Sequence, residues 1–260
     1  MSLSLTELRE AAIEFAKAGG DSTLNYFKKS FDLEIKEDAS PVTNADREAE
    51  AIIRKKIKKH FPGHGIIGEE FGAENEESEI VWVLDPIDGT KSFIHGIPFY
   101  TTLIGILKNR KPVAGVIYAP ALDEIVSAAE GQGCTYNGHP AKVRKCDSVS
   151  DATFLTTDVR SFNEYGIGKS FEELLGECRI HRTWGDAYGH MLVATGRADI
   201  MIDAILNIWD AAALLPVVTE AGGSFTDLNG KVSIETGNAI SCNRLLSDGI
   251  LKYFKKNRSL

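Results

Sequence analysis

Two aspartates, Asp85 and Asp88, stand three positions apart at the end of an apolar run. The run, residues 80–84, is short and rich in β-branched side chains, which predicts a buried strand that ends at Asp85. Pro86 cannot continue the hydrogen-bonded ladder of a sheet, so the chain should turn there. Acidic side chains at the end of a strand lie where α/β folds place their ligand sites. Hard carboxylate oxygens in such a place suit Mg²⁺ better than zinc.

The residues that follow the two aspartates favour an anion as the second ligand. Gly89 permits a tight turn, and the backbone N–H groups of Gly89 and Thr90 can then receive a phosphate. A divalent cation held beside a phosphate is the arrangement that hydrolyses phosphate esters. The stretch from Trp82 to Phe93 therefore indicates a Mg²⁺-dependent phosphatase.

Two other acidic stretches can converge on the same place. Glu69 and Glu70 close a short apolar stretch that reads as a strand, and Asp210 lies near the start of a predicted helix. Several carboxylates in one pocket repel one another unless cations neutralise them, so we expect two or three Mg²⁺ ions. One ion would lower the pKa of a bound water, and another would take up the charge that develops on the leaving oxygen.

The composition is that of a globular protein: 260 residues, of which 43% are hydrophobic and 25% charged. The net charge of −8 argues against a nucleic-acid-binding surface, which would be basic. No apolar stretch reaches the ~20 residues of a bilayer crossing, and the first residues lack the basic start and apolar core of a signal peptide. Four scattered cysteines without a C-x-x-C pair suggest free thiols in a reducing cytosol. We therefore expect a cytoplasmic protein that binds neither nucleic acid nor membrane.

Periodicity predicts the elements that must position these residues. Helices are expected over 3–29, which Gly19-Gly20 weaken and can divide into two pieces, and over 43–60, 189–196, 209–221 and 243–256. Strands are expected over 66–70, 80–84, 99–107, 113–118, 124–129, 200–203, 224–227 and 239–241, with an antiparallel meander before residue 130. Residues 72–79 are expected to form an exposed acidic loop.

The pattern of elements changes near residue 147. We therefore expect residues 1–260 to form a single catalytic unit with two halves. Residues 1–147 would be an α+β half that carries the metal motif, and residues 148–260 an α/β half that selects the substrate.

Four stretches, in order, resemble the inositol monophosphatase / fructose-1,6-bisphosphatase superfamily, the lithium-sensitive Mg²⁺ phosphatases. They are Pro41-Val-Thr-Asn-Ala-Asp46, Ile67-Gly-Glu-Glu70, Asp85-Pro-Ile-Asp-Gly-Thr90, and Trp209-Asp210 with Thr219-Glu-Ala-Gly-Gly223. Any one of them is weak evidence, but their order and spacing agree over nearly the whole chain. The resemblance implies the layered αβαβα sandwich of this superfamily, with mixed α+β and α/β character. It also implies a small phosphorylated substrate and a homodimer.

The resemblance assigns metal ligands residue by residue. It implies a first metal bound by Glu69, Asp85 and the carbonyl of Ile87. A second metal would be bound by Asp85, Asp88 and Asp210.

The same resemblance assigns the catalytic groups. Thr90 would orient the attacking water, and Asp46 would be the acid paired with that threonine. Glu69 would act in catalysis as well as in metal binding. The backbone of Gly89 and Thr90 would hold the phosphate. The implied mechanism is in-line attack by a metal-bound hydroxide, without a phosphoenzyme.

Several of these residues also have an ordinary structural interpretation. Asp46 can cap its helix, and Asp88 can be a turn aspartate, because Asp-Gly is a common turn signal. Glu70 is expected behind Glu69 or at the surface. Trp209 is expected to be a packing residue, and His190 to lie in the core or at the surface rather than at the substrate.

In the family that the chain resembles, the leaving group is held by the stretches that correspond to residues 182–189 and 203–207. These stretches place the carboxylates of Asp186 and Asp203, with Gly185 and Asn207, near the leaving group. An inositol needs neutral polar partners for its hydroxyls, whereas a carboxylate suits an ammonium or imidazolium. The Trp-Gly-Asp-x-Tyr-Gly stretch and Thr90-Lys-Ser-Phe93 resemble the histidinol-phosphatase branch, which implies L-histidinol phosphate as substrate, in histidine biosynthesis.

Alternatives remain open at this point. Asp186 can be a helix N-cap and Asp203 an ordinary loop acid. The protein can be an inositol-1-monophosphatase or a broad-specificity sugar phosphatase, or a non-enzymatic module that binds metal or phosphate. A mobile segment near the site is expected within residues 31–43 or 70–79.

Overall fold

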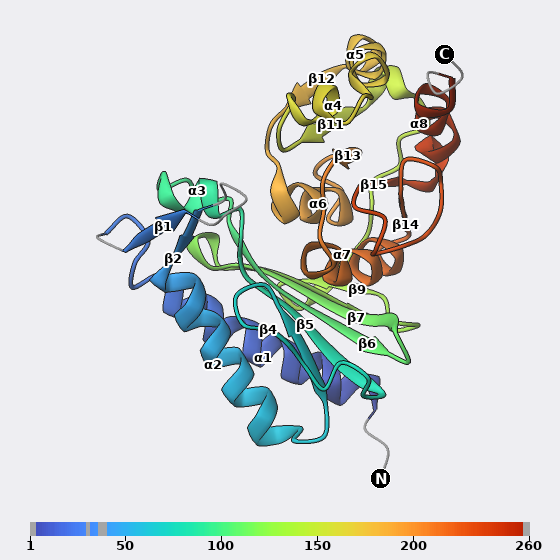
Figure 1. The fold of residues 1–260 in the computed structure, drawn as a ribbon. Helices are drawn as coiled ribbons and strands as arrows, with labels where there is room; N and C mark the ends of the chain where they lie inside the picture. Colours follow the sequence, from blue (N-terminus) through green and yellow to red (C-terminus); the bar gives the residue numbers. More distant parts are fainter. Residues whose placement is uncertain (1–3, 30–31, 36–40, 257–260) are drawn as a thin grey trace.

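The computed structural model describes residues 4–29, 32–35 and 41–256. Helices and sheets alternate in layers through this part of the chain (Figure 1). Helices α1 (Leu5–Thr23) and α2 (Asn44–His60) cover one face of a large sheet, and α6 (Asp186–Ala194) and α7 (Ile208–Glu220) lie between it and a second sheet. The outer face of the second sheet is covered by α4 (Ser161–Glu164), α5 (Gly168–Glu177) and α8 (Arg244–Lys256). The predicted αβαβα sandwich is confirmed.

The first sheet has eight strands among the described residues, in the order β10-β9-β8-β7-β6-β5-β3-β4. Only β3 and β5 run parallel, and the other neighbours in the described sheet are antiparallel, so the predicted meander is confirmed. The bounds are β3 (Gly65–Gly68), β4 (Gly72–Glu74), β5 (Ile80–Asp88), β6 (Thr101–Lys108), β7 (Lys111–Ala119), β8 (Glu124–Ala129), β9 (Cys134–Tyr136) and β10 (His139–Ala141).

The second sheet has the order β12-β11-β13-β15-β14, with β11 parallel to both of its neighbours. Its strands are β11 (Thr153–Thr156), β12 (Ile180–Arg182), β13 (Ile200–Asp203), β14 (Gly223–Thr226) and β15 (Ala239–Asn243). The first sheet ends at Ala141 and the second begins at Thr153, so the change of pattern near residue 147 falls between the two sheets. A short hairpin of β1 (Leu33–Ile35) and β2 (Pro41–Thr43) precedes α2.

The central strand β5 is buried on both faces, which explains its continuous apolar sequence. Successive side chains of a strand point to opposite faces. Val81 and Val83 accordingly pack in the cluster under α7, while Trp82 and Leu84 pack in the cluster under α1 and α2. The strand is thus fixed from both sides, and so is its acidic end.

Helix α7 lies unusually close to the first sheet. A Cβ on Gly115 of β7 would lie 2.2 Å from the carbonyl oxygen of Ala213, and one on Gly105 of β6 would lie 2.6 Å from the Cβ of Ala212. Small residues on both sides therefore permit this approach. It brings the first turn of α7, with Asp210, onto the sheet that carries Asp85.

Three expectations about elements were wrong. Helix α1 is unbroken at Gly19 and Gly20, because both glycines pack tightly, against Ile53 and Tyr118, and tertiary contact outweighs their low helix propensity. The helix ends at Thr23 rather than near residue 29. Within the expected loop 72–79, residues Gly72–Glu74 form the exposed edge strand β4.

The four cysteines are free, as predicted.

Candidate active site

The acidic end of β5 contains a β-bulge. Asp85 pairs with Leu103 and Asp88 with Thr101, so one extra residue is inserted between them. The expectation that the strand ends at Asp85 was therefore wrong, although the regular ladder does stop there. The bulge accommodates Pro86, which has no N–H to donate, while its carbonyl accepts a hydrogen bond from the Thr102 hydroxyl at 2.8 Å.

The bulge turns both aspartates toward the seam between the two halves. Asp85 is buried, and its Oδ1 accepts a hydrogen bond from the backbone N–H of Ile87 at 3.0 Å. Oδ2 of Asp88 accepts from the hydroxyl of Thr101 at 3.2 Å and from the N–H of Ala187 at 2.6 Å. Ala187 belongs to α6, so Asp88 is held from both halves of the chain.

Glu69 reaches the same place through the parallel pairing of β3 with β5. Gly68 pairs with Leu84, so the next residues, Glu69 directly after β3 and Asp85 within β5, follow side by side. The N–H of Glu69 donates to the carbonyl of Leu84 at 3.2 Å. The sequence prediction that these acids converge agrees with this arrangement.

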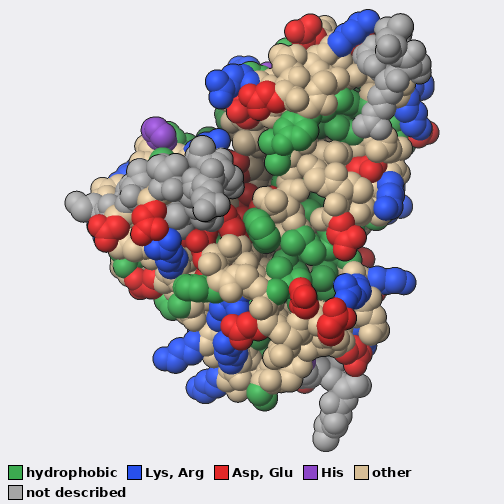
Figure 2. All heavy atoms as spheres, in the orientation of Figure 1, with side chains coloured by type: hydrophobic (Ala, Val, Ile, Leu, Met, Phe, Trp, Pro, Cys, Tyr) green, Lys and Arg blue, Asp and Glu red, His purple; other side chains and the backbone are tan. Residues whose placement is uncertain are grey.

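Asp210 approaches from the first turn of α7, where its Oδ2 accepts a hydrogen bond from the N–H of Asn207 at 2.7 Å. Asp85, Asp88 and Asp210 each place a carboxylate oxygen within 4.8 Å of the others. Oxygen atoms from three carboxylates at such separations fit a hard divalent cation. Acidic side chains gather in the hollow between the two halves in Figure 2.

The electrostatics of the cluster call for a cation. Burial raises the pKa of Asp85 well above its ordinary value, and the nearby carboxylate of Glu69 raises it further. Burial likewise raises the pKa of Asp88, and it raises the pKa of Asp210 to about 7. Acids that resist ionisation in the protein alone would ionise readily beside Mg²⁺, so the residues present fit the metal.

The turn after the bulge positions Thr90. Gly89 has a positive φ of 82°, as its expected turn requires, and α3 (Thr90–Ile94) starts directly after it. The Thr90 hydroxyl donates to the carbonyl of Ile87 at 3.0 Å. That carbonyl is the one implied as a metal ligand.

Asp46 lies at the start of α2 and is buried. Its Oδ2 accepts from the N–H and the hydroxyl of Thr43, at 2.8 and 2.6 Å, so its interpretation as a helix cap is confirmed. Its Oδ1 is buried without a hydrogen-bond partner in the described part of the chain. Burial raises the pKa of Asp46 to about 7, and Glu70 and Glu69 add to the rise. Asp46 therefore both caps its helix and faces the acidic site.

Asp186 stands at the first position of α6 in a left-handed conformation, with φ of 53°. Gly185 is the N-cap, and the Asp186 side chain makes no capping bond, so the N-cap interpretation of Asp186 was wrong. Its N–H donates to the hydroxyl of Thr157 at 2.7 Å. Burial raises the pKa of Asp186 to about 7, and the charges of Asp203 and Asp210 contribute.

Asp203 is a buried acid at the end of β13, not an ordinary loop acid. Its Oδ2 lies 3.1 Å from Nε2 of His190, and Nδ1 of that ring lies 2.6 Å from the hydroxyl of Ser241. Of the two positions left open for His190, the core is the correct one. Asn207 is the N-cap of α7.

Sequence reasoning missed the groups that orient these acids. The N–H of Ala187 and the hydroxyls of Thr101 and Thr157 carry no recognisable signal, because backbone and hydroxyl donors occur everywhere. His190 contacts Asp203, which lies 13 positions further along the chain, and no local pattern signals that pairing.

Three comparisons place this fold and site among known proteins. The sequence model of the inositol monophosphatase family matches residues 4–259. The chain therefore belongs to the inositol monophosphatase family, and it is a phosphatase of that family.

Within the family, the chain is 39% identical to the histidinol-phosphatase of Chlorobaculum parvum over 244 residues, 93% of this chain and 94% of that protein. It is 36% identical to the fructose-1,6-bisphosphatase/inositol-1-monophosphatase of Thermotoga maritima over 211 residues, 81% of this chain and 78% of that protein. Among solved structures, the extragenic suppressor protein suhB of Bartonella henselae matches with a TM-score of 0.90 at 30% identity, covering 96% of this chain and 98% of that one. The resemblance to the superfamily and its histidinol-phosphatase branch is confirmed.

None of the helices within the described ranges has both the length and the apolar character needed to traverse a lipid bilayer.

Proposed function

We propose that the protein is a Mg²⁺-dependent phosphatase that hydrolyses L-histidinol phosphate to histidinol and phosphate. One observation carries the substrate choice. The site holds two acids, Asp186 and Asp203, in addition to the cluster of Asp85, Asp88 and Asp210. Carboxylates that are not needed for the metal are available to the leaving group.

A positively charged leaving group explains why such acids lie there. L-histidinol carries an amine and an imidazole, and a buried carboxylate binds an ammonium or imidazolium through charge-assisted hydrogen bonds. An inositol offers only hydroxyls and would leave the half-buried carboxylate of Asp186 without a charged partner, and the buried Asp203 with its contact to His190 alone. Asp186 and Asp203, with Gly185 and Asn207 beside them, are therefore the proposed substrate-binding residues.

The proposed metal ligands are the side chains of Glu69, Asp85, Asp88 and Asp210 and the carbonyl of Ile87. When bound, Mg²⁺ would lower the pKa of a water and neutralise charge on the leaving oxygen.

Groups of the protein itself would orient the attacking water and bind the phosphate. The Thr90 hydroxyl donates to Ile87, so its oxygen is left as an acceptor that can orient the attacking water. Asp46 stays the proposed acid for Thr90, because its buried Oδ1 has no hydrogen-bond partner among the described residues and is free to accept a proton donor. The N–H groups of Gly89 and Thr90 are the proposed phosphate contacts.

The relatives support the phosphatase class more strongly than the substrate. Proteins named histidinol-phosphatase and proteins named fructose-1,6-bisphosphatase/inositol-1-monophosphatase both match over most of the chain. An inositol-1-monophosphatase or broad-specificity sugar phosphatase is therefore the second candidate. The acidic residues proposed to face the leaving group favour histidinol phosphate as the substrate.

Phosphate release with Mg²⁺ tests the proposal, comparing kcat/KM for L-histidinol phosphate and inositol 1-phosphate. We expect a preference for histidinol phosphate above ~100-fold, about 2.7 kcal/mol of transition-state binding. Asp186→Asn and Asp203→Asn should each reduce this preference by about tenfold, since each removes a charged partner. Asp248→Asn, at an exposed position of α8, is the control. Equal use of both esters would contradict the substrate assignment and leave the metal chemistry intact.

We also propose that residues 1–260 act as a single catalytic unit, as a cytoplasmic homodimer. The contribution of Ala187 in the second half to the position of Asp88 in the first supports the single unit. Light scattering on the purified protein would test the dimer, since a mass of one chain of 28.4 kDa would exclude it.

A further inference from the structure

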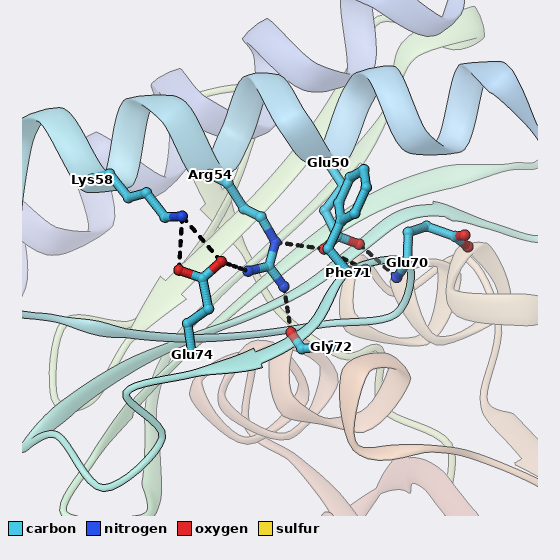
Figure 3. A network of polar contacts seen from close by, with 7 residues as sticks. All are labelled: Glu50, Arg54, Lys58, Glu70, Phe71, Gly72 and Glu74. Carbon is cyan, nitrogen blue, oxygen red and sulfur yellow. Dashed lines mark hydrogen bonds and ion pairs between the residues drawn. The ribbon is translucent and has the colours of Figure 1, made fainter.

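A buried carboxylate on α2 binds the chain just beyond Glu69. Glu50 is fully buried, and its Oε1 accepts hydrogen bonds from Nε of Arg54 at 2.7 Å and from the N–H of Phe71 at 3.2 Å. Its Oε2 accepts from the N–H of Glu70 at 2.8 Å. Figure 3 shows the Glu70 side chain extending away from this contact, so the bond is made by the backbone alone.

Arg54 completes the network from the next turn of the helix. One terminal nitrogen donates to Glu74 Oε1 at 3.0 Å, and the other donates to the carbonyl of Gly72. The centroid of the Phe71 ring lies 5.9 Å from the guanidinium carbon, and Lys58 contacts both carboxylate oxygens of Glu74 (Figure 3). The guanidinium is almost fully buried, so these bonds leave it little freedom.

The network fixes one short segment, the turn of residues 69–71 that joins β3 to β4. Three consecutive backbone N–H groups of this turn donate hydrogen bonds. The N–H of Glu69 donates to the carbonyl of Leu84, and those of Glu70 and Phe71 donate to the Glu50 carboxylate. With its backbone held at both ends, the turn has one orientation, and the direction of the Glu69 side chain follows from it.

We propose that Glu50, held in place by Arg54, is a positioning residue that aims Glu69 at the metal. This inference rests on the proposed function, in which Glu69 is a metal ligand. Groups that orient metal ligands commonly change metal affinity by about 10- to 100-fold when they are lost.

Stability alone does not account for a buried ion pair here. Replacing a buried ion pair by apolar residues of similar volume is often neutral or stabilising, so a fold that needed only packing would not need Glu50 and Arg54. The two charges cancel, so the pair adds no net charge beside the site. The four-residue spacing of Asp46, Glu50, Arg54 and Lys58 places them in one row along α2, from the acidic site to the far end of the turn.

Gly68 is a second sign that the contact is specific. A Cβ at this position would lie 2.1 Å from Oε1 of Glu50 and 2.9 Å from a terminal nitrogen of Arg54. Since Arg54 holds Glu50 from the other side, that carboxylate cannot move aside freely. Only glycine lets the carboxylate reach the amides of the turn.

The first test is Glu50→Gln, which keeps the shape of the side chain but removes its charge. The Mg²⁺ dissociation constant is measured by calorimetry, together with kcat, KM and the melting temperature. We expect the dissociation constant for Mg²⁺ to rise by about 10- to 100-fold, while kcat at saturating Mg²⁺ stays within about tenfold. Ile53→Ala, a core residue on the same helix, is the control that lowers the melting temperature and leaves Mg²⁺ affinity unchanged.

The second test separates positioning from stability. Glu50→Leu combined with Arg54→Met removes both buried charges, so its melting temperature should exceed that of Glu50→Leu alone. Mg²⁺ affinity should remain low in both variants, because the turn amides lack an acceptor. Normal Mg²⁺ affinity in this double variant or in Glu50→Gln would overturn the proposal. If the unmodified protein itself failed to bind Mg²⁺, the proposed function would fall and this inference with it.

Discussion

The imidazole of His190 and the carboxylate of Asp203 meet inside the C-terminal half, with Nε2 of the ring 3.1 Å from Oδ2 of the acid. The other ring nitrogen lies 2.6 Å from the hydroxyl of Ser241. Ser241 thus orients the His190 ring, and the ring in turn orients the carboxylate of Asp203. Only one oxygen of that carboxylate is used in this contact. The remaining oxygen can face a cationic leaving group.

Replacing His190 should therefore weaken substrate selection. In His190→Gln we expect KM for L-histidinol phosphate to rise by about tenfold, in line with about 1.5 kcal/mol for a hydrogen bond to a charged group. KM for inositol 1-phosphate should change less. His139→Gln, at an exposed position of β10, is the control. An equal rise of KM for both substrates would mean that the ring serves the fold alone.

Substitutions of the proposed metal ligands should have opposite effects on activity and on stability. Asp85→Asn and Asp210→Asn should each lower kcat/KM by more than about 10³-fold, because each removes a proposed metal ligand. In the metal-free protein near pH 8, the same changes should raise the melting temperature, since they relieve repulsion between buried carboxylates. Thermal unfolding in a chelator checks this, and a lower melting temperature would contradict the repulsion argument.

The stability of the metal-free protein should fall as pH rises from about 5 to about 8. Burial raises the pKa of Asp46, Asp186 and Asp210 to about 7, so the folded protein binds more protons than the unfolded chain between about pH 4 and pH 7. The free energy of unfolding therefore declines through this window. Mg²⁺ competes with these protons, so it should raise the melting temperature more at pH 8 than at pH 6.

Two histidines act against this trend. Burial lowers the pKa of His64 and His181, which favours folding as pH rises toward about 6.5. The Asp210→Asn variant separates the effect of the acids from that of the histidines. The melting temperature of this variant should decline less steeply between pH 5 and pH 8 than that of the unmodified protein. Parallel pH profiles for the two proteins would show that the acids are not responsible.

The close packing of α7 should make activity sensitive to a single methyl group at Gly115. Gly115→Ala places a carbon against the Ala213 carbonyl, so we expect a loss of about 1–3 kcal/mol of stability. A displaced α7 also moves Asp210, so kcat should fall as well. Gly176→Ala in α5 is the matched control, because nothing lies within 4 Å of the added carbon, and it should stabilise by about 0.5–1 kcal/mol.

The sequence was most informative where chemistry and periodicity coincide. Asp85 and Asp88 directly follow the apolar run that predicts β5, and parallel pairing with β3 brings Glu69 beside Asp85. Gly19 and Gly20 predicted a weak point in α1, but tight packing keeps the helix intact. No local sequence pattern encodes that packing.

Other parts of the site depend on contacts between distant segments. The N–H of Ala187 reaches Asp88 across 99 positions of sequence, and any residue type but proline would supply it. Glu50 belongs to a helix that reads as an ordinary charged surface helix, yet it is buried. Of the segments expected to be mobile, residues 31–43 lie partly outside the described residues, and mobility of residues 70–79 stays a prediction.

Helix α7 packs over one face of the first sheet, and this order of elements affects how the chain folds during its synthesis. The sheet face that includes Val83, Leu103 and Ile117 packs under a helix that begins only at Ile208. A ribosome delivers strands β5 to β8 well before that helix, so the nascent chain carries an open apolar face for much of its synthesis. Such faces aggregate or recruit chaperones. A product that ends ahead of α7 would keep this face open, so burial of the first sheet has to wait until residues 208–220 are translated.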